Sequence, residues 1–232
     1  MELLSFGDSG WGDEMLLATL MTLVISVSAF ALGLLLGAIG AAMKRSRFAP
    51  LRWLAEGYTT VARGVPELLI IYLLFFGSSG AVMFVARMFG YGGYIEVNAF
   101  IVGVTAIGLV QGAYQTEVFR GAVDAVPKGQ IEAAYAAGMD DFLLLRRVMV
   151  PQVLRLALPG LGNCWVSALK ETALVSVTGL VEIMRQSHVA AGSSRHPFLF
   201  YTLAAVLFLG LTTFSGTGFR RLEKWANRGE RT

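Results

Sequence analysis

Long apolar segments alternate with short polar stretches along the chain. The segments span 15–43, 68–86, 97–116, 156–181 and 197–219, and all but the fourth are free of charged residues. A helix rises about 1.5 Å per residue, so about 20 residues cross a hydrocarbon core of about 30 Å. The pattern therefore predicts an all-α integral membrane protein with about five transmembrane helices. The mixed stretch 53–65 is expected to form the first turns of the second helix.

The positions of the basic residues predict an orientation. Basic residues follow the first apolar segment at 44–52, the third at 120–155 and the fifth at 220–231. Such clusters mark the cytoplasmic side of a membrane protein, which places the N-terminus outside and the C-terminus inside. The residues before the first segment are acidic and include no Lys or Arg, so they do not resemble a cleaved signal peptide. Residues 182–196 are then expected to form an outer loop.

Composition supports a membrane protein and excludes several other classes. Hydrophobic residues make up 55% of the chain and charged residues 15%, against about 25% charged in soluble domains. A net charge of +3 is too small to indicate a nucleic-acid partner. The single cysteine, Cys164, excludes an intrachain disulfide and a cysteine metal cluster. His188 and His196 lack a third ligand at a recognisable spacing, so no metal site is expected.

Residues 117–155 form the longest polar stretch between apolar segments, and we expect a large cytoplasmic loop with helices of its own. Residues 131–137 are predicted to form a short helix whose alanines, Ala133 and Ala134 among them, permit close docking of another protein. Gly138 should end this helix, because glycine adopts a positive φ at little steric cost. An ordinary amphipathic surface helix remains the alternative.

A second helix is expected directly after the first. Asp140 and Asp141 are suitable N-terminal caps because their carboxylates accept hydrogen bonds from free backbone N–H groups. Pro151 is expected to end or kink this helix because proline has no backbone N–H.

The same loop carries a motif of specific spacing. Glu132, Ala133 and Ala134 are followed after three residues by Gly138, and the stretch closes with Val148, Val150 and Pro151. This arrangement resembles the coupling-loop signature Glu-Ala-Ala-x3-Gly-x9-Ile-x-Leu-Pro of the permease subunits of bacterial ABC importers. The two valines are conservative departures from that signature.

The resemblance covers nearly the whole chain. Residues 63–67, 112–121, 128–130 and 170–174 look like the polar amino-acid branch of this family, and within it the histidine, arginine and octopine/nopaline permeases. The resemblance implies a type I importer permease fold in a bacterial inner membrane, with 1–232 as one transmembrane domain and Glu132, Ala133, Ala134 and Gly138 as the contact to an ATPase.

The resemblance also implies partners: a second permease subunit, two ATP-binding subunits and a periplasmic solute-binding protein. The chain itself contains no Gly-x4-Gly-Lys-Ser/Thr loop, so we expect ATP to be bound by the partner subunits and the chain to be a transport subunit without a cofactor or enzymatic activity of its own.

Charged and amide side chains inside the apolar segments are candidates for a substrate path, because such groups are costly in a bilayer. Lys170 and Glu171 are about 100° apart around their helix and must reach different neighbours. An amino acid needs a donor for its carboxylate and an acceptor for its ammonium group. The candidates are Glu67, Gln111, Gln115, Asn163, Lys170, Glu171 and Thr172. A structural hydrogen-bond network that holds the helices together is an equal alternative.

Two further features of the apolar segments predict local packing. Arg63 and Glu67 are four residues apart and are expected to pair on one helical face, with contact to the substrate as the alternative. Gly33, Gly37 and Gly40 are spaced to allow another helix to approach the first one closely.

These observations predict the permease subunit of an importer for a basic amino acid or an opine, which works by alternating access. Another polar amino acid, such as glutamine or glutamate, is the alternative substrate. A membrane-embedded hydrolase is disfavoured because the sequence has no His-Glu-x-x-His motif or Ser-His-Asp arrangement. A membrane scaffold without transport is also possible, but it would not require charges at Lys170 and Glu171.

Overall fold

The computed structural model describes residues 2–7, 10–91, 93 and 98–227, and every regular element in this part of the chain is helical. The predicted all-α class is therefore confirmed. The elements are η1 (Glu2–Leu4), α1 (Gly12–Lys44), α2 (Ala49–Gly64), α3 (Glu67–Met88), α4 (Ala99–Asp124), α5 (Lys128–Ala136), α6 (Asp141–Leu144), the π-helical η2 (Leu145–Met149), α7 (Val150–Val175), η3 (Ser176–Thr178), α8 (Ile183–Ser194) and α9 (Pro197–Ala226).

Four of these helices, α1, α3, α4 and α9, are long and apolar enough to cross a membrane. A fifth span is formed if the segment Asp141–Thr178 and α8, which are bent by 50° relative to each other, are counted together. The expected number of about five spans is confirmed in this sense.

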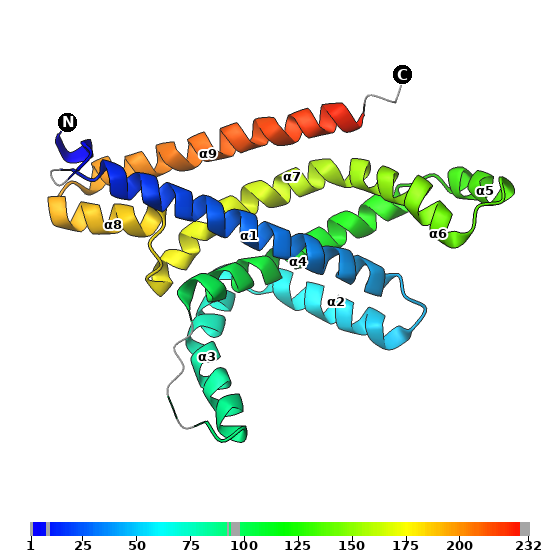
Figure 1. The fold of residues 1–232 in the computed structure, drawn as a ribbon, viewed down its shortest axis with the longest axis horizontal. Coiled ribbons are helices and arrows are strands. Elements are labelled where there is room, and N and C mark those ends of the chain that lie inside the picture. The colour runs from blue at the N-terminus through cyan, green and yellow to red at the C-terminus, as the bar shows by residue number, and fades with distance from the viewer. Residues whose placement is uncertain (1, 8–9, 92, 94–97, 228–232) are drawn as a thin grey trace.

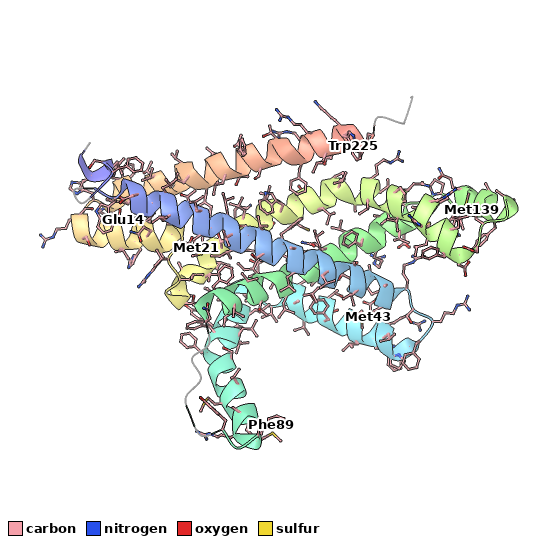
Figure 2. The ribbon with its side chains drawn as sticks, viewed as in Figure 1. Glu14, Met21, Met43, Phe89, Met139 and Trp225 are labelled. Atoms are coloured by element: carbon pink, nitrogen blue, oxygen red, sulfur yellow. The ribbon has the colours of Figure 1, made fainter. Side chains whose placement is uncertain are left out.

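The helices form an elongated bundle (Figure 1). Helices α1, α4, α7 and α9 run lengthwise, with α1 packed on α4 and α7, and α7 packed on α4 and α9. The N-terminus and α8 lie at one end, and α5 and α6 lie at the other. Figure 2 accordingly shows Glu14 and Met139 near opposite ends, with Phe89 at the tip of α3, which projects away from the bundle. The predicted coupling loop is thus far from the predicted outer side.

Glycines bring α1 and α4 into close contact, as their spacing predicts. A Cβ added at Gly33 would lie 2.8 Å from Nε2 of Gln115, and one added at Gly37 would lie 2.7 Å from the Cβ of the same residue. Gly40 faces Thr116 one turn further on. These distances leave no space for a methyl group, so the two backbones approach closely.

The second apolar segment differs from the prediction. Residues 53–65 do not form its first turns but belong to a separate helix, α2, which ends at Gly64. Val65 is extended, with φ −100° and ψ 137°, and α3 begins after Pro66. The break has a local cause, because the ring of a proline disfavours the helical conformation of the residue before it.

The prediction that residues 182–196 form an outer loop is wrong, because most of these residues belong to helix α8. The fourth apolar segment ends earlier than predicted, at Val175, followed by a short 3-10 turn and Gly179 at φ +85°. Glu182 then caps α8 by accepting hydrogen bonds from the backbone N–H groups of Met184 at 3.0 Å and Arg185 at 2.7 Å. The polar character of α8 concealed it among loop residues.

The boundaries of the polar stretch 117–155 also change. Helix α4 continues to Asp124 and α7 begins at Val150, so both ends of the stretch belong to long helices. Only the residues between these helices form the connection. Their expected helices are present as α5 and α6.

Candidate functional site

Helix α5 presents most of the coupling motif on its surface. Glu132, Ala133 and Gly138 are exposed, whereas Ala134 is buried against the rest of the chain. Gly138 has φ +79°, as predicted, and nothing lies within 4 Å of the position of an added Cβ. The glycine is therefore required for backbone geometry and not for space, and it ends the helix with its small residues accessible to a partner.

Side chains tie α5 to the helices that follow it. The Tyr135 hydroxyl donates a hydrogen bond to Oδ1 of Asp141 at 2.8 Å, which raises the pKa of Tyr135. Asp140 caps α6, as predicted, by accepting a hydrogen bond from the N–H of Leu143 at 2.7 Å. Gln152, in the first turn of α7, donates a hydrogen bond to Gln130 of α5. These contacts connect α5 to α6 and to the first turn of α7.

The second helix expected before Pro151 is short, because α6 ends at Leu144 and a π-helical turn separates it from α7. Pro151 lies in the first turn of α7, and the preceding turn, Leu145–Met149, is π-helical. Because proline cannot donate the ordinary helical hydrogen bond, the wider turn before it accommodates the missing donor.

A buried polar cluster lies between α4 and α7. Nε2 of Gln111 donates a hydrogen bond to Oε1 of Glu171 at 2.7 Å. Gln111, Gln115 and Thr172 are fully buried, and Glu171 is 7% exposed. The second carboxylate oxygen of Glu171, the amide oxygen of Gln111 and both polar atoms of the Gln115 amide have no hydrogen-bond partner among the described residues. Buried polar atoms are normally paired, so this cluster has capacity for a further polar group.

Two charged residues border this cluster. Glu67, in the first turn of α3, and Lys170 are both close enough to Glu171 for their charges to interact with it. Lys170 is exposed on the surface of the single chain, whereas Glu171 is buried toward α4, as expected for adjacent residues on a helix. The structure therefore brings Glu67, Gln111, Lys170 and Glu171 together.

The remaining candidates are placed differently. Gln115 lies one turn further along α4, against Gly33 and Gly37 of α1. Asn163 is exposed on α7, two turns before Glu171. The Thr172 hydroxyl donates a hydrogen bond to the carbonyl of Leu169 at 2.8 Å, so its proton is used within the helix.

The expected pairing of Arg63 and Glu67 on one helical face is wrong. The break at Val65 and Pro66 places the two residues on different helices. The guanidinium of Arg63 instead lies over the ring of Tyr114, 5.4 Å from its centroid.

An ion-pair network at the ends of α1 and α4 was not predicted. Nζ of Lys44 lies 2.6 Å from Oε1 of Glu117 and 3.2 Å from Oε2 of Glu56, so it joins α1 to α4 and α2. Arg120 contacts Glu117 at 2.8 Å and Asp124 at 3.1 Å. The spacing of 117, 120 and 124 indicates the helical pairs, but no local signal relates Lys44 to Glu117.

Residues 29–225 match the family of binding-protein-dependent transport system inner membrane components. The chain belongs to this family. It is 53% identical to the nopaline transport system permease protein NocQ of Agrobacterium fabrum, over 100% of this chain and 99% of that one. It is 40% identical to the histidine/lysine/arginine/ornithine transport system permease protein HisQ of Escherichia coli, over 93% and 94% of the two chains.

The fold agrees with this assignment. A crystal structure of an amino acid ABC transporter with histidines includes a chain that matches with a TM-score of 0.79 and 30% identity, over 92% of this chain and 94% of that one. The type I importer permease fold expected from the sequence is confirmed. The chain is a multi-pass permease subunit of the inner membrane.

Proposed function

We propose that the chain is the transmembrane permease subunit of an ATP-driven bacterial importer for basic amino acids or opines, and that it moves its substrate by alternating access. The observation that carries this proposal is the buried carboxylate of Glu171, which has one oxygen paired with Gln111 and the other without a hydrogen-bond partner in the described part of the chain. The relatives support the substrate class, since NocQ is named for nopaline and HisQ for histidine, lysine, arginine and ornithine.

The charges of the cluster suit a molecule with both cationic and anionic groups. Glu171, with Glu67 nearby, attracts an ammonium or guanidinium group, and charge-assisted hydrogen bonds of this kind are stronger than neutral ones. Lys170 offers a cation for a carboxylate on the exposed side of α7, where a second permease would close the path. Gln111 and Gln115 supply amide groups, with Asn163 and Thr172 as further polar residues of the same path.

The partners belong to the same proposal. A second permease subunit pairs with this one as a heterodimer, two ATP-binding subunits bind and hydrolyse ATP, and a periplasmic binding protein delivers the substrate. The exposed Glu132, Ala133 and Gly138, with the buried Ala134 anchoring their helix, form the contact to an ATP-binding subunit. Movement of α5 reaches α7, which carries Glu171, through Gln130 and Gln152.

Uptake by the complete complex, reconstituted in vesicles, tests the function. ATP is supplied on the side of the membrane that carries the ATP-binding subunits. Five candidate substrates are then tested separately: L-arginine, L-histidine, nopaline, L-glutamine and L-glutamate. We expect saturable, ATP-dependent uptake of a cationic amino acid or an opine. Uptake of only glutamine or glutamate would favour the alternative substrate class, and an assembled complex that transports none of the five would contradict the proposal.

The coupling contact has its own test. Glu132→Lys reverses an exposed charge on α5 without altering a buried contact. We expect a complex that loses its ATP-binding subunit more readily and transports more slowly. Glu223→Lys on α9, which reverses a charge outside the coupling motif, is the matched control.

A further inference from the structure

A polar cavity of about 520 Å³ lies beside α4, on the side that α2 covers. Its lining includes Lys44, Glu56, Thr60, Arg63, Tyr114 and Glu117. The cavity begins at Gly64, directly before the break that leads to Glu67, and extends to Lys44, where α1 ends on the predicted cytoplasmic side. It therefore extends from the break between α2 and α3 toward the predicted cytoplasmic end of α1.

The charges that line this cavity are not all paired. Lys44 and Arg120 contact the carboxylates of Glu117, Glu56 and Asp124. Arg63 has no ion pair with the described residues, and its contact is with the ring of Tyr114. A guanidinium that lies over an aromatic ring keeps its N–H donors at its edges free for hydrogen bonds.

We propose that this cavity is a binding subsite for the carboxylate of the transported molecule on its way to the cytoplasm. Arg63 binds the carboxylate, and Tyr114 holds the guanidinium in place. Glu56, whose Oε2 pairs with Lys44 and whose side chain is 62% exposed, lies in the same lining and is the carboxylate that we assign to the cationic group. The inference rests on the proposed function, because it assigns a second position for the same substrate.

The Arg63 guanidinium matches the carboxylate in geometry as well as in charge. Its planar fork donates two parallel hydrogen bonds to a carboxylate, which an ammonium group does not. A competing explanation is that Arg63 pairs with a carboxylate of the second permease. The two explanations differ in whether a free amino acid protects the cavity from chemical modification.

The experiment uses the complete complex with Thr60→Cys in the cavity and Cys164→Ser, in inside-out vesicles. Thr60 is exposed, and Cys164 is the chain's own cysteine. A charged, membrane-impermeant maleimide is added from the cytoplasmic side, and the rate of modification at position 60 is measured by peptide mass. L-arginine and nopaline are the probes, and agmatine, which has the guanidinium of arginine but no carboxylate, is the control ligand.

We expect L-arginine or nopaline to slow modification at position 60, and agmatine to have little effect. Adding Arg63→Gln should raise the half-protecting concentration about tenfold, as loss of a charge-assisted hydrogen bond predicts. Arg63→Lys should raise it less, because it retains the charge. Arg87→Gln, the same exchange at the far end of α3, should leave it unchanged.

Three results would overturn the subsite: neither probe protects position 60, agmatine protects as well as L-arginine, or Arg63→Gln leaves protection unchanged. Loss of the second permease from both Arg63 variants would also overturn it and assign Arg63 to the subunit interface. Uptake measured on the unmodified complex separates the two proposals. If that complex imports L-arginine or nopaline, only the subsite fails, whereas absence of uptake contradicts the function itself.

Discussion

Gln111 of α4 and Glu171 of α7 are joined by a hydrogen bond of 2.7 Å, although 60 residues separate them in the sequence. The bond uses one oxygen of the carboxylate and one N–H of the amide. The other carboxylate oxygen and the amide oxygen stay without a partner among the described residues. The pair therefore links two helices and leaves two polar atoms unpaired, which we propose as contacts for the substrate.

Removing the charge of Glu171 while keeping the shape of its side chain separates a structural role from a role in substrate binding. Glu171→Gln preserves the volume and one hydrogen bond to Gln111, so we expect assembly to be retained. Uptake of L-arginine should fall about tenfold or more, because a charge-assisted hydrogen bond becomes a neutral one. Reconstituted complexes of matched subunit ratio provide the measurement, with Glu223→Gln as the control. Unchanged uptake would exclude this carboxylate from the substrate path.

The contact between α1 and α4 makes a prediction about stability. Gly37→Ala places a methyl group 2.7 Å from the Cβ of Gln115, and overpacking of this kind costs about 1–3 kcal/mol. We expect a lower melting temperature of the purified subunit in detergent. Gly216→Ala on α9 meets nothing within 4 Å and should melt no earlier than the unmodified chain. Equal melting temperatures for both variants would contradict the close packing.

The positive φ of Gly138 makes a prediction about coupling. Gly138→Ala has space for its methyl group, but a left-handed conformation costs an L-residue about 1–2 kcal/mol. We expect the end of α5 to shift and the number of substrates transported per ATP to decrease. Gly129→Ala, in the first turn of α5 and also with no described atom within 4 Å of the added Cβ, serves as the comparison. A normal transport-to-ATP ratio in the Gly138 variant would disprove the importance of this turn.

Burial distinguishes the ion pairs of the cytoplasmic network. The side chain of Lys44 is 5% exposed and that of Glu117 is 22% exposed, whereas Arg45 and Asp124 are about half exposed. A double-mutant cycle with Lys44→Met and Glu117→Gln should give a coupling free energy of about 1–3 kcal/mol. The same cycle with Arg45→Met and Asp124→Asn should give less than about 1 kcal/mol. Unfolding in mixed micelles measures both, and the reverse order would contradict the structure.

The orientation is tested by labelling single cysteines in a Cys164→Ser background. Asp140→Cys should react only from the cytoplasmic side, and Gly192→Cys, at an exposed position of α8, only from outside. Both follow from the distribution of basic residues. Reaction of position 140 from the periplasm would overturn the topology together with the coupling contact.

Local chemistry predicted much of this structure. The lengths of the apolar segments located the transmembrane spans. Gly138 has the positive φ, and Asp140 the N-cap hydrogen bond, that their residue types favour. The separate helix α2 was missed although its cause, Pro66, is visible in the sequence, because the mixed stretch 53–65 was assigned to the same helix as the apolar segment that follows it. Helix α8 was missed because its buried residues include the polar Gln186 and Ser187, whereas the apolar Met184 and Val189 are exposed, so no clear apolar face is visible in the sequence.

The sequence predicted which residues belong to the candidate site better than it predicted which of them contact one another. Charge at Lys170 and Glu171 inside an apolar segment identifies a costly position whatever its partners are. That Glu171 meets Gln111 depends on how α4 and α7 pack, and that Lys44 meets Glu117 depends on how α1 packs on α4. The spacing of residues in a single sequence does not indicate which residues of distant helices come into contact.

The close contact of Gly37 with Gln115 also constrains how the protein is made. Helix α1 ends at Lys44, but its packing partner α4 begins only at Ala99, after α2 and α3 have been synthesised. During translation α1 is therefore complete before α4 exists, and the face of α1 that carries Gly33, Gly37 and Gly40 has no α4 to pack against. The packing of α1 against α4 is therefore completed only after α4 has been synthesised, so a chain that ends before Ala99 lacks the surface on which Gly33, Gly37 and Gly40 pack.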